Sequence, residues 1–164
     1  MSASGGPPPL RPFGLVLHRD GRWSHEGQPV THRRLREAFD RSVRFLPDEE
    51  KYVVQLGAFR GQIELEEAAF FVHDVDAVDG TLALSDGSRE PFDPATLHPS
   101  HLDDGWLCTV KRRLVEGGLP ARFTQAAWAE LMRGLEETAS GLALRVAGVL
   151  HALPPEPVRR GRAP

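Results

Sequence analysis

The chain has 164 residues, 40% of them hydrophobic, and a formal net charge of −3. This length suits one ordinary core, or two small units that share a core, and is too short for several independent domains. Acidic residues concentrate in the middle: residues 48–106 hold fourteen acids and three bases, whereas 1–47 and 107–164 carry an excess of basic residues. An acidic centre argues against nucleic-acid binding across the whole face, so we expect no nucleic-acid partner.

Cys108 is the single cysteine, which excludes a disulfide within the chain. It lies in the apolar stretch WLCTV, where we expect a buried small hydrophobic residue and not a reactive thiol. The first residues show no basic stretch followed by an apolar run, and nowhere do eighteen apolar residues stand together. We therefore expect a cytoplasmic protein without a signal peptide or membrane segment.

Both ends of the chain are rich in residues that do not pack. The opening Ser, Gly and Pro run and the closing PPEPVRRGRAP lack apolar periodicity, so residues 1–12 and 154–164 are predicted to be disordered tails. Between them we expect two halves, an N-terminal α+β half over 13–95 and a C-terminal α+β half over 96–153.

The first predicted element is a hairpin over FGLVLHRDGRWSHEG. An apolar run precedes Asp20-Gly21, a strong turn signal, and a second strand follows around Trp23.

An amphipathic helix is predicted over PVTHRRLREAFDRSVRFLP. Its apolar residues recur at helical spacing: Leu35, Ala38, Phe39, Val43 and Leu46. Thr31 is placed to cap it, Val30 to contact Leu35, and Pro47 to end it. Five arginines take its other face: Arg33, Arg34, Arg36, Arg41 and Arg44. That face is either an ordinary solvated surface, which we favour, or a contact for an anionic partner.

The middle of the chain is predicted to be a strand meander, YVVQL, QIELE, AFFVHDV and TLALS, with glycine-containing breaks. Ile63 and Leu65 alternate with Glu64 and Glu66, so the glutamates should share the water-facing side. The acidic cluster is therefore interpreted as a solvated sheet face and not as a metal site.

The last third repeats this design. WLCTVKRRL is a predicted strand, FTQAAWAELMRGLEE a second amphipathic helix capped by Thr124, and LALRVAGVLHAL a final strand. The threonine caps, each followed by apolar residues at the same spacing, indicate a faint internal repeat of two strand-plus-helix units. Common capping chemistry alone could produce the same match. Strands grouped away from two helices predict an α+β fold with antiparallel sheets.

The histidines are the main candidates for chemistry. His73 alternates with Phe71 and Val75, so we expect a hydrogen-bonded core histidine. The segment HPSHLDD brings His98, His101 and Asp103 together as weak metal-ligand candidates. Two histidines three apart supply only two zinc ligands, and then only on a helical turn, which Pro99 disfavours. We therefore predict no metal and no cofactor.

Several catalytic motifs are missing from the sequence. There is no Gly-x-Ser-x-Gly elbow, no histidine signalled as a partner of Cys108, and no glycine-rich phosphate-binding loop. A serine, histidine and acid occur in any chain of this length by chance, so they indicate no hydrolase by themselves.

The order of several motifs resembles the bacterial domain-of-unknown-function 1285 family. They are WSHEGQPVTH, KYVVQL, IELEEAAFFV, the LHP loop and VEGGLPARFTQAAWAEL, and they span about residues 18 to 153. The resemblance implies two related α+β halves and no established activity, with signalling or regulation only a suggestion for that family. Where the family usually has Glu-Asp-Ala-Pro-Phe, this chain has Glu66-Glu67-Ala68-Ala69-Phe70. Where it favours arginine in the second half, this chain has Glu116 and Gln125.

From these observations we expect a binding or regulatory module without catalytic activity, with Trp23, His73, His98 and Arg122 as candidate ligand-binding residues. Its partner would be a small molecule or a protein. Two alternatives stay open. One is a small metal-dependent hydrolase centred on the His98 and His101 loop, and the other is a structural protein that assembles as a homo-oligomer.

Overall fold

The computed structural model describes residues 11–154. Its contacts group into two compact units, which divide between Ala69 and Phe70. The expected boundary between residues 95 and 96 therefore lies inside the second unit. Of the predicted tails, residues 1–10 and 155–164 lie outside the described residues, whereas residues 11 and 12 already belong to the first strand.

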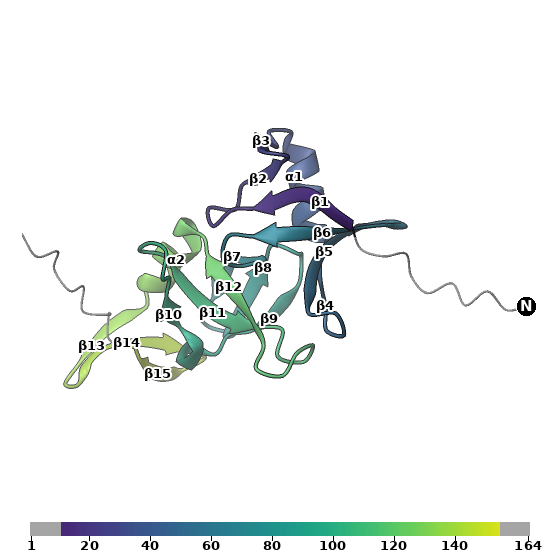
Figure 1. The fold of residues 1–164 in the computed structure, drawn as a ribbon. Coiled ribbons are helices and arrows are strands. Elements are labelled where there is room, and N and C mark those ends of the chain that lie inside the picture. Colours follow the sequence, from purple (N-terminus) through teal and green to yellow (C-terminus); the bar gives the residue numbers. More distant parts are fainter. Residues whose placement is uncertain (1–10, 155–164) are drawn as a thin grey trace, which may run out of the picture. The chain divides into compact units, whose positions relative to one another are not determined.

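The first unit contains one six-stranded sheet and one helix (Figure 1). In chain order the elements are β1 (Arg11–Leu17), β2 (Trp23–His25), β3 (Gln28–Pro29), α1 (Arg33–Ser42), β4 (Val43–Leu46), β5 (Lys51–Leu56) and β6 (Phe59–Leu65). The strand order is β3-β2-β1-β6-β5-β4, with the central strands β1 and β6 parallel and the other neighbours antiparallel.

The predicted hairpin and the predicted alternation are both confirmed in this sheet. β1 pairs antiparallel with β2 around the turn that contains Asp20 and Gly21. The buried face carries Leu15, Leu17, Trp23 and Ile63, which are 0–5% exposed. Glu64 is exposed, because successive side chains of a strand point to opposite faces.

Helix α1 is shorter than predicted. It ends at Ser42, because Val43 takes extended backbone angles (φ −63°, ψ 129°) and starts β4. Val43 is buried by pairing opposite Val54 and not by a helical stripe. The predicted Thr31 cap is wrong, since His32 is the N-cap and its Nδ1 accepts from the Leu35 N–H at 3.3 Å. Pro47 does not end the helix.

The second unit contains a second six-stranded sheet, helix α2 and a three-stranded sheet. Its elements are β7 (Phe70–Asp76), β8 (Thr81–Leu84), β9 (Arg89–Pro91), the 3-10 turn η1 (Pro94–Thr96), β10 (His98–Pro99), β11 (Trp106–Val110), β12 (Leu119–Phe123), α2 (Gln125–Met132), β13 (Leu135–Thr138), β14 (Gly141–Val146) and β15 (Val149–Ala152). The predicted Thr124 cap of α2 is confirmed, because its hydroxyl oxygen accepts from the Ala127 N–H.

Two predictions for this unit need correction. The second predicted helix ends earlier, and Leu135 begins β13 instead of extending the apolar stripe. The predicted final strand is a hairpin of β14 and β15, whose turn holds Ala147 and Gly148 at φ 50° and 77°. The apolar run LALRVAGVLHAL therefore contains a turn that was not predicted, and the first residue of this turn is an alanine at positive φ.

The two six-stranded sheets have the same topology. In the first, the chain runs outward through β1, β2 and β3, crosses over, and returns inward through β4, β5 and β6. In the second, it runs outward through β7, β8 and β9, crosses over, and returns through β10, β11 and β12, with β7 and β12 parallel at the centre. Helix α1 forms the first crossover, whereas η1 lies in the second and α2 follows β12. The two helices that were predicted with threonine caps therefore occupy different topological positions.

These elements confirm the α+β class, with sheets that are antiparallel apart from one central parallel pair in each six-stranded sheet. The predicted meander is divided, because β6 joins the first sheet and β7 the second. None of the helices within residues 11–154 has the length and apolar character needed to cross a membrane.

Candidate functional site

A buried charge cluster in the second unit is centred on Lys111, which follows β11 with a positive φ of 57°. Lys111 Nζ lies 2.6 Å from Asp86 Oδ2, 2.9 Å from Ser88 Oγ and 3.1 Å from Glu90 Oε2. The three charged side chains are 16%, 9% and 20% exposed for Lys111, Asp86 and Glu90. Because the ammonium has three donors and three oxygen partners, its hydrogen-bonding capacity is filled.

The same cluster fixes the backbone where β11 ends. The Lys111 N–H donates to Glu90 Oε1 at 2.7 Å, and Lys111 Nζ lies 5.0 Å from the centre of the Phe70 ring. These contacts join β7, β9 and β11 around one cation. A positive φ is uncommon for a residue with a side chain, and here it is held by several simultaneous contacts.

Two neighbouring groups have shifted pKa values. Burial alone would raise the pKa of Asp86, but hydrogen bonds from Lys111 and Ser88 outweigh it and hold the pKa below its ordinary value of 3.8. Burial, with the Glu90 charge nearby, raises the pKa of the Cys108 thiol to about 12. Cys108 is fully buried and stays an uncharged thiol, as the sequence predicted.

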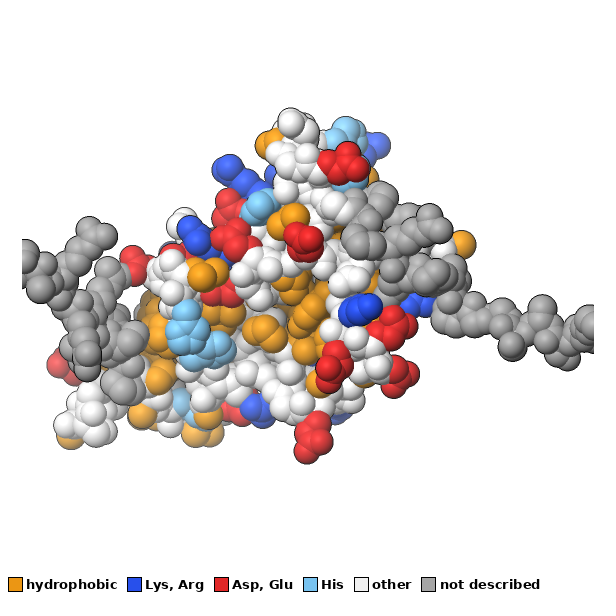
Figure 2. Space-filling view, in the orientation of Figure 1, with side chains coloured by type: hydrophobic (Ala, Val, Ile, Leu, Met, Phe, Trp, Pro, Cys, Tyr) orange, Lys and Arg blue, Asp and Glu red, His pale blue; other side chains and the backbone are white. Residues whose placement is uncertain are grey.

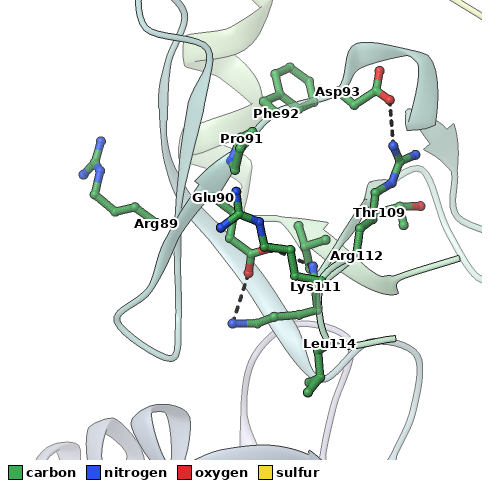
Figure 3. Close-up of a pocket in the computed structure, with 11 residues that line it drawn as sticks. Arg89, Glu90, Pro91, Phe92, Asp93, Thr109, Lys111, Arg112 and Leu114 are labelled. Atoms are coloured by element: carbon green, nitrogen blue, oxygen red, sulfur yellow. Dashed lines mark hydrogen bonds and ion pairs between the residues drawn. The ribbon is translucent and has the colours of Figure 1, made fainter. Parts of the chain in front are cut away.

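Next to this cluster lies an open groove of about 430 Å³ (Figure 3). We call it the β9–β11 groove; it is lined by residues 89–93 and 109–114. In Figure 3, Glu90, Lys111 and Arg112 line its interior, whereas Arg89 points away. Within residues 11–154, strand β9 is the edge of its sheet and pairs only with β8, so its other side has no strand partner there.

The groove combines apolar and cationic surface. Phe92 and Val110 are buried in its wall, and Leu114 is 47% exposed at one end (Figure 3). Arg112 Nη1 lies 3.0 Å from Asp93 Oδ2 in an exposed pair, and Arg113 makes no salt bridge or hydrogen bond to any other described residue. Adjacent cations beside an apolar wall suit a ligand with an anionic and an apolar part.

A tight loop holds the arginines at the groove. The chain turns between β11 and β12 through Gly117 and Gly118, at φ 80° and 72°. A Cβ atom on Gly118 would lie 2.4 Å from Thr109 Cγ2 and 2.6 Å from the Val110 carbonyl oxygen. Only glycine therefore allows the loop to return this close to β11.

The residues singled out from the sequence lie elsewhere. Trp23 is 1% exposed, packs on Phe39 at 5.4 Å between ring centroids, and donates from Nε1 to Asp40 Oδ1 at 2.8 Å. The structure thus gives Trp23 a packing role. It joins β2 to helix α1 in the first unit.

His73 was expected in the core, and that expectation is wrong. Its side chain is exposed, because the pairing of β7 with β8 shifts between Val72 and Asp74. A β-bulge places one extra residue in a strand and interrupts the alternation of its faces. No feature of the local sequence announces this bulge.

His98 and Arg122 have partners within the second unit. His98 Nδ1 lies 3.0 Å from the Thr96 carbonyl oxygen. Arg122, whose side chain is 12% exposed, donates to both carboxylate oxygens of Asp103 at 2.9 and 2.7 Å. Ligand binding by these two residues stays a prediction.

The loop that contains His98, His101 and Asp103 does not form a ligand cluster. Asp103 is engaged by Arg122, and His98 lies on β10 while His101 is exposed. Within residues 11–154 no group of three or more His, Cys, Asp or Glu side chains is arranged to hold a metal ion.

Sequence reasoning missed the groove and its Lys111 cluster. Its acids and its lysine are 21 to 25 residues apart and meet only because β9 and β11 approach at one end. The nearest signal was KRRL at the end of a predicted strand, followed by Gly117-Gly118.

Two solved structures are similar to this chain. A crystal structure of a DUF1285 family protein from Silicibacter pomeroyi matches with a TM-score of 0.59 and 18% identity, over 92% of this chain and 88% of that one. A second, of a DUF1285 family protein from Shewanella baltica, matches with a TM-score of 0.50 and 13% identity, over 74% of this chain and 91% of that one. The chain therefore resembles DUF1285 proteins in fold, as its motifs predicted.

No family model and no curated protein matches the chain. The likeness to the two solved structures concerns the fold alone, so the site has to be interpreted from its own geometry.

Proposed function

We propose that this protein is a binding module, and that the β9–β11 groove binds a small amphipathic anion. The observation that carries the proposal is the pairing of an apolar wall with adjacent guanidinium groups in a hollow of about 430 Å³. Pockets for small ligands range from about 300 to 1,000 Å³ and combine apolar lining with a few placed polar groups.

The charge arrangement favours an anion over a cation. Lys111 is held by Asp86 and Glu90, so its positive charge is already compensated within the wall. Among the described residues, Arg113 has no partner and Arg112 pairs only with Asp93, in an exposed salt bridge. A carboxylate would gain two charge-assisted donors at the loop without displacing the buried cluster.

The position of these arginines supports a regulatory role. Arg112 and Arg113 belong to the loop between β11 and β12, so a ligand that bridges them to β9 would restrict that loop. A signalling role, which has been suggested for the family that this chain resembles, is compatible with a ligand that restricts this loop. A cytoplasmic location fits the single cysteine, Cys108, which is buried and unpaired.

A matched pair of small probes tests the proposal. Benzoate and benzamide have the same ring, but benzoate is an anion and benzamide is neutral. NMR titrations of the full chain with each probe therefore measure how much the negative charge contributes to binding. We expect benzoate to shift the amides of residues 89–93 and 109–114, with benzamide several-fold weaker. The Arg113→Gln variant should lose most of this preference.

The control variant is Arg133→Gln, which removes an exposed arginine of the same unit that pairs with Glu130 outside the groove. It should bind benzoate as the wild type does. Equal binding of both probes, or amide shifts that avoid the groove, would show that this hollow is not an anion site.

A further inference from the structure

Three side chains of the first unit form a hydrogen-bonded chain outside the β9–β11 groove. His18 Nε2 lies 2.8 Å from Ser24 Oγ, and His18 Nδ1 lies 3.1 Å from Glu66 Oε2. A hydroxyl, an imidazole and a carboxylate in this order and at these distances form the nucleophile, base and orienting acid of serine hydrolases. The proposed ligand site in the second unit does not involve any of them.

The strand arrangement explains how these distant residues meet. Strands β2, β1 and β6 are neighbours in that order, with Ser24 opposite Val16 and Leu65 opposite Leu17. His18 follows β1 on the face of Val16, and Glu66 follows β6 beside it, with its N–H donating to the Leu17 carbonyl oxygen. All three side chains therefore stand on the side opposite the buried face.

The partners of the imidazole fix its hydrogen-bond directions. A carboxylate can only accept, so His18 Nδ1–H donates to Glu66, and neutral His18 then offers the Nε2 lone pair to the Ser24 hydroxyl. Arg19 holds the same carboxylate, with Nη1 at 3.2 Å from Oε1 and its N–H at 3.4 Å from Oε2. Glu66 is thus fixed from two sides, and the orientation of His18 is fixed with it.

The hydrogen-bonded side chains of His18, Ser24 and Glu66 border a hollow that reaches solvent. About 300 Å³ in volume, the hollow is lined by His18, Arg19, Asp20, Arg22, Trp23, Ser24, Pro29 and Glu66. His18 and Glu66 are 39% and 32% exposed, so a substrate can reach them without the unit opening. Arg22, whose side chain is 81% exposed, lies 3.5 Å through Nε from Asp20 Oδ2 and supplies a cation at the hollow for a developing negative oxygen.

We propose that Ser24 is a nucleophile for acyl transfer from small esters, with His18 as general base and Glu66 as the residue that positions it. Ser24 Oγ bonds to the ester carbonyl carbon while its proton passes to His18 Nε2. The carbon–oxygen bond to the alcohol then breaks, and the alcohol leaves with that proton. Water attacks the acyl-serine in the same way, releases the carboxylic acid and restores Ser24.

The volume of the hollow limits the substrate. About 300 Å³ is the low end for a ligand pocket, so we expect a preference for acyl groups of a few carbons. The cationic groups that line the hollow are the guanidinium groups of Arg19 and Arg22, so we expect slow turnover relative to hydrolases that use fixed backbone donors.

Covalent labelling tests the inference in the unmodified protein. A fluorophosphonate probe reacts with a serine that is activated by a neighbouring base and forms a stable adduct. Peptide mass spectrometry of the labelled full chain should place the adduct on Ser24. His18→Gln should reduce the labelling rate at least tenfold, whereas His151→Gln, which changes a histidine on β15 of the second unit, should leave it unchanged.

A second variant separates activation from folding. Ser24→Cys places a thiol beside His18, and iodoacetamide should alkylate it much faster than Cys108, whose thiol is buried. Hydrolysis of p-nitrophenyl acetate should fall at least tenfold in Ser24→Ala and stay unchanged in Ser140→Ala, since Ser140 lies in an exposed turn.

Other results would overturn the inference. If folded wild-type protein takes no label at Ser24, and the Ser24→Cys thiol reacts no faster than an ordinary exposed thiol, the chain of contacts is only a structural link between β1, β2 and β6. Loss of thermal stability in Ser24→Ala with unchanged ester hydrolysis would lead to the same conclusion.

Discussion

The two six-stranded sheets share one strand order but are held together in different ways. In the first unit, the crossover is helix α1, and a buried tryptophan joins that helix to the sheet. In the second unit, the crossover holds one 3-10 turn, and a lysine with two carboxylates joins the edge strand β9 to β11. One topology therefore tolerates either an aromatic or an ionic link.

This difference matters for function because crossovers and returning loops are where a repeated sheet can vary. The central strands must keep their alternating buried faces to maintain a core. The segments that join them are less constrained. In the second unit the loop after β11 carries Arg113, which has no partner among the described residues, and in the first unit the turn after β1 carries His18.

The largest expected effect concerns the aromatic link. Trp23→Ala should lower the free energy of unfolding by about 3–5 kcal/mol, because a large buried side chain leaves a cavity. Trp23→Phe keeps an aromatic ring on Phe39 and loses the bond to Asp40, so about 1–2 kcal/mol is expected. Urea denaturation followed by circular dichroism measures both.

A half-buried tryptophan of the second unit provides the control. Trp106 stacks on Trp128 at 5.0 Å between centroids, with 9° between the ring planes. Trp106→Ala should cost about 1.5 kcal/mol, less than the change at Trp23. Equal losses at the two positions would contradict the idea that the aromatic link is specific to the first unit.

The ionic link gives the next effect. Lys111→Met leaves Asp86 and Glu90 facing each other without a cation, and should cost about 3 kcal/mol, as expected when one partner of a buried pair is removed. Lys51→Met, on the exposed surface of β5, should change stability by less than about 0.5 kcal/mol. The same denaturation measurement applies, and a cost at Lys111 no larger than the cost at Lys51 would contradict the prediction.

Much of the fold could be predicted from sequence because alternation and turn chemistry act locally. The Asp20-Gly21 hairpin, the faces of Ile63 and Glu64, and the Thr124 cap all depend on residues within a few positions of one another. The errors arose where distant pairing decided the outcome. Val43 continues the helical spacing of α1, yet pairing with Val54 makes it a strand residue.

The candidate sites could not be predicted for the same reason. Glu90 and Lys111 stand 21 residues apart, and His18 and Glu66 stand 48 apart. No local pattern links these pairs, since strand register alone brings them together. A bulge at His73 likewise depends on how β7 meets β8 and not on the residues of β7 alone.

The ionic link should also make the second unit sensitive to acid. The folded pKa of Asp86 is depressed, so its contribution to stability is present above the ordinary carboxyl pKa near 3.8 and is lost as the pH falls through the lower folded value. We expect wild-type stability to fall below about pH 4. Asp86→Asn should flatten that part of the curve, measured as denaturation midpoints between pH 2 and 6. An unchanged slope in Asp86→Asn would assign the acid sensitivity to other carboxylates.

The smallest expected difference separates the two helix caps. Thr124 accepts from the Ala127 N–H at 3.2 Å in a half-buried position, and its own N–H donates to the Val72 carbonyl oxygen on β7. Thr124→Ala should therefore cost about 1 kcal/mol. His32 accepts at 3.3 Å from an exposed position, so His32→Ala should cost less than about 0.5 kcal/mol. Urea midpoints of the two variants resolve the difference. A larger loss for His32→Ala than for Thr124→Ala would show that the exposed cap of α1 contributes more than the half-buried cap of α2, and would contradict the prediction.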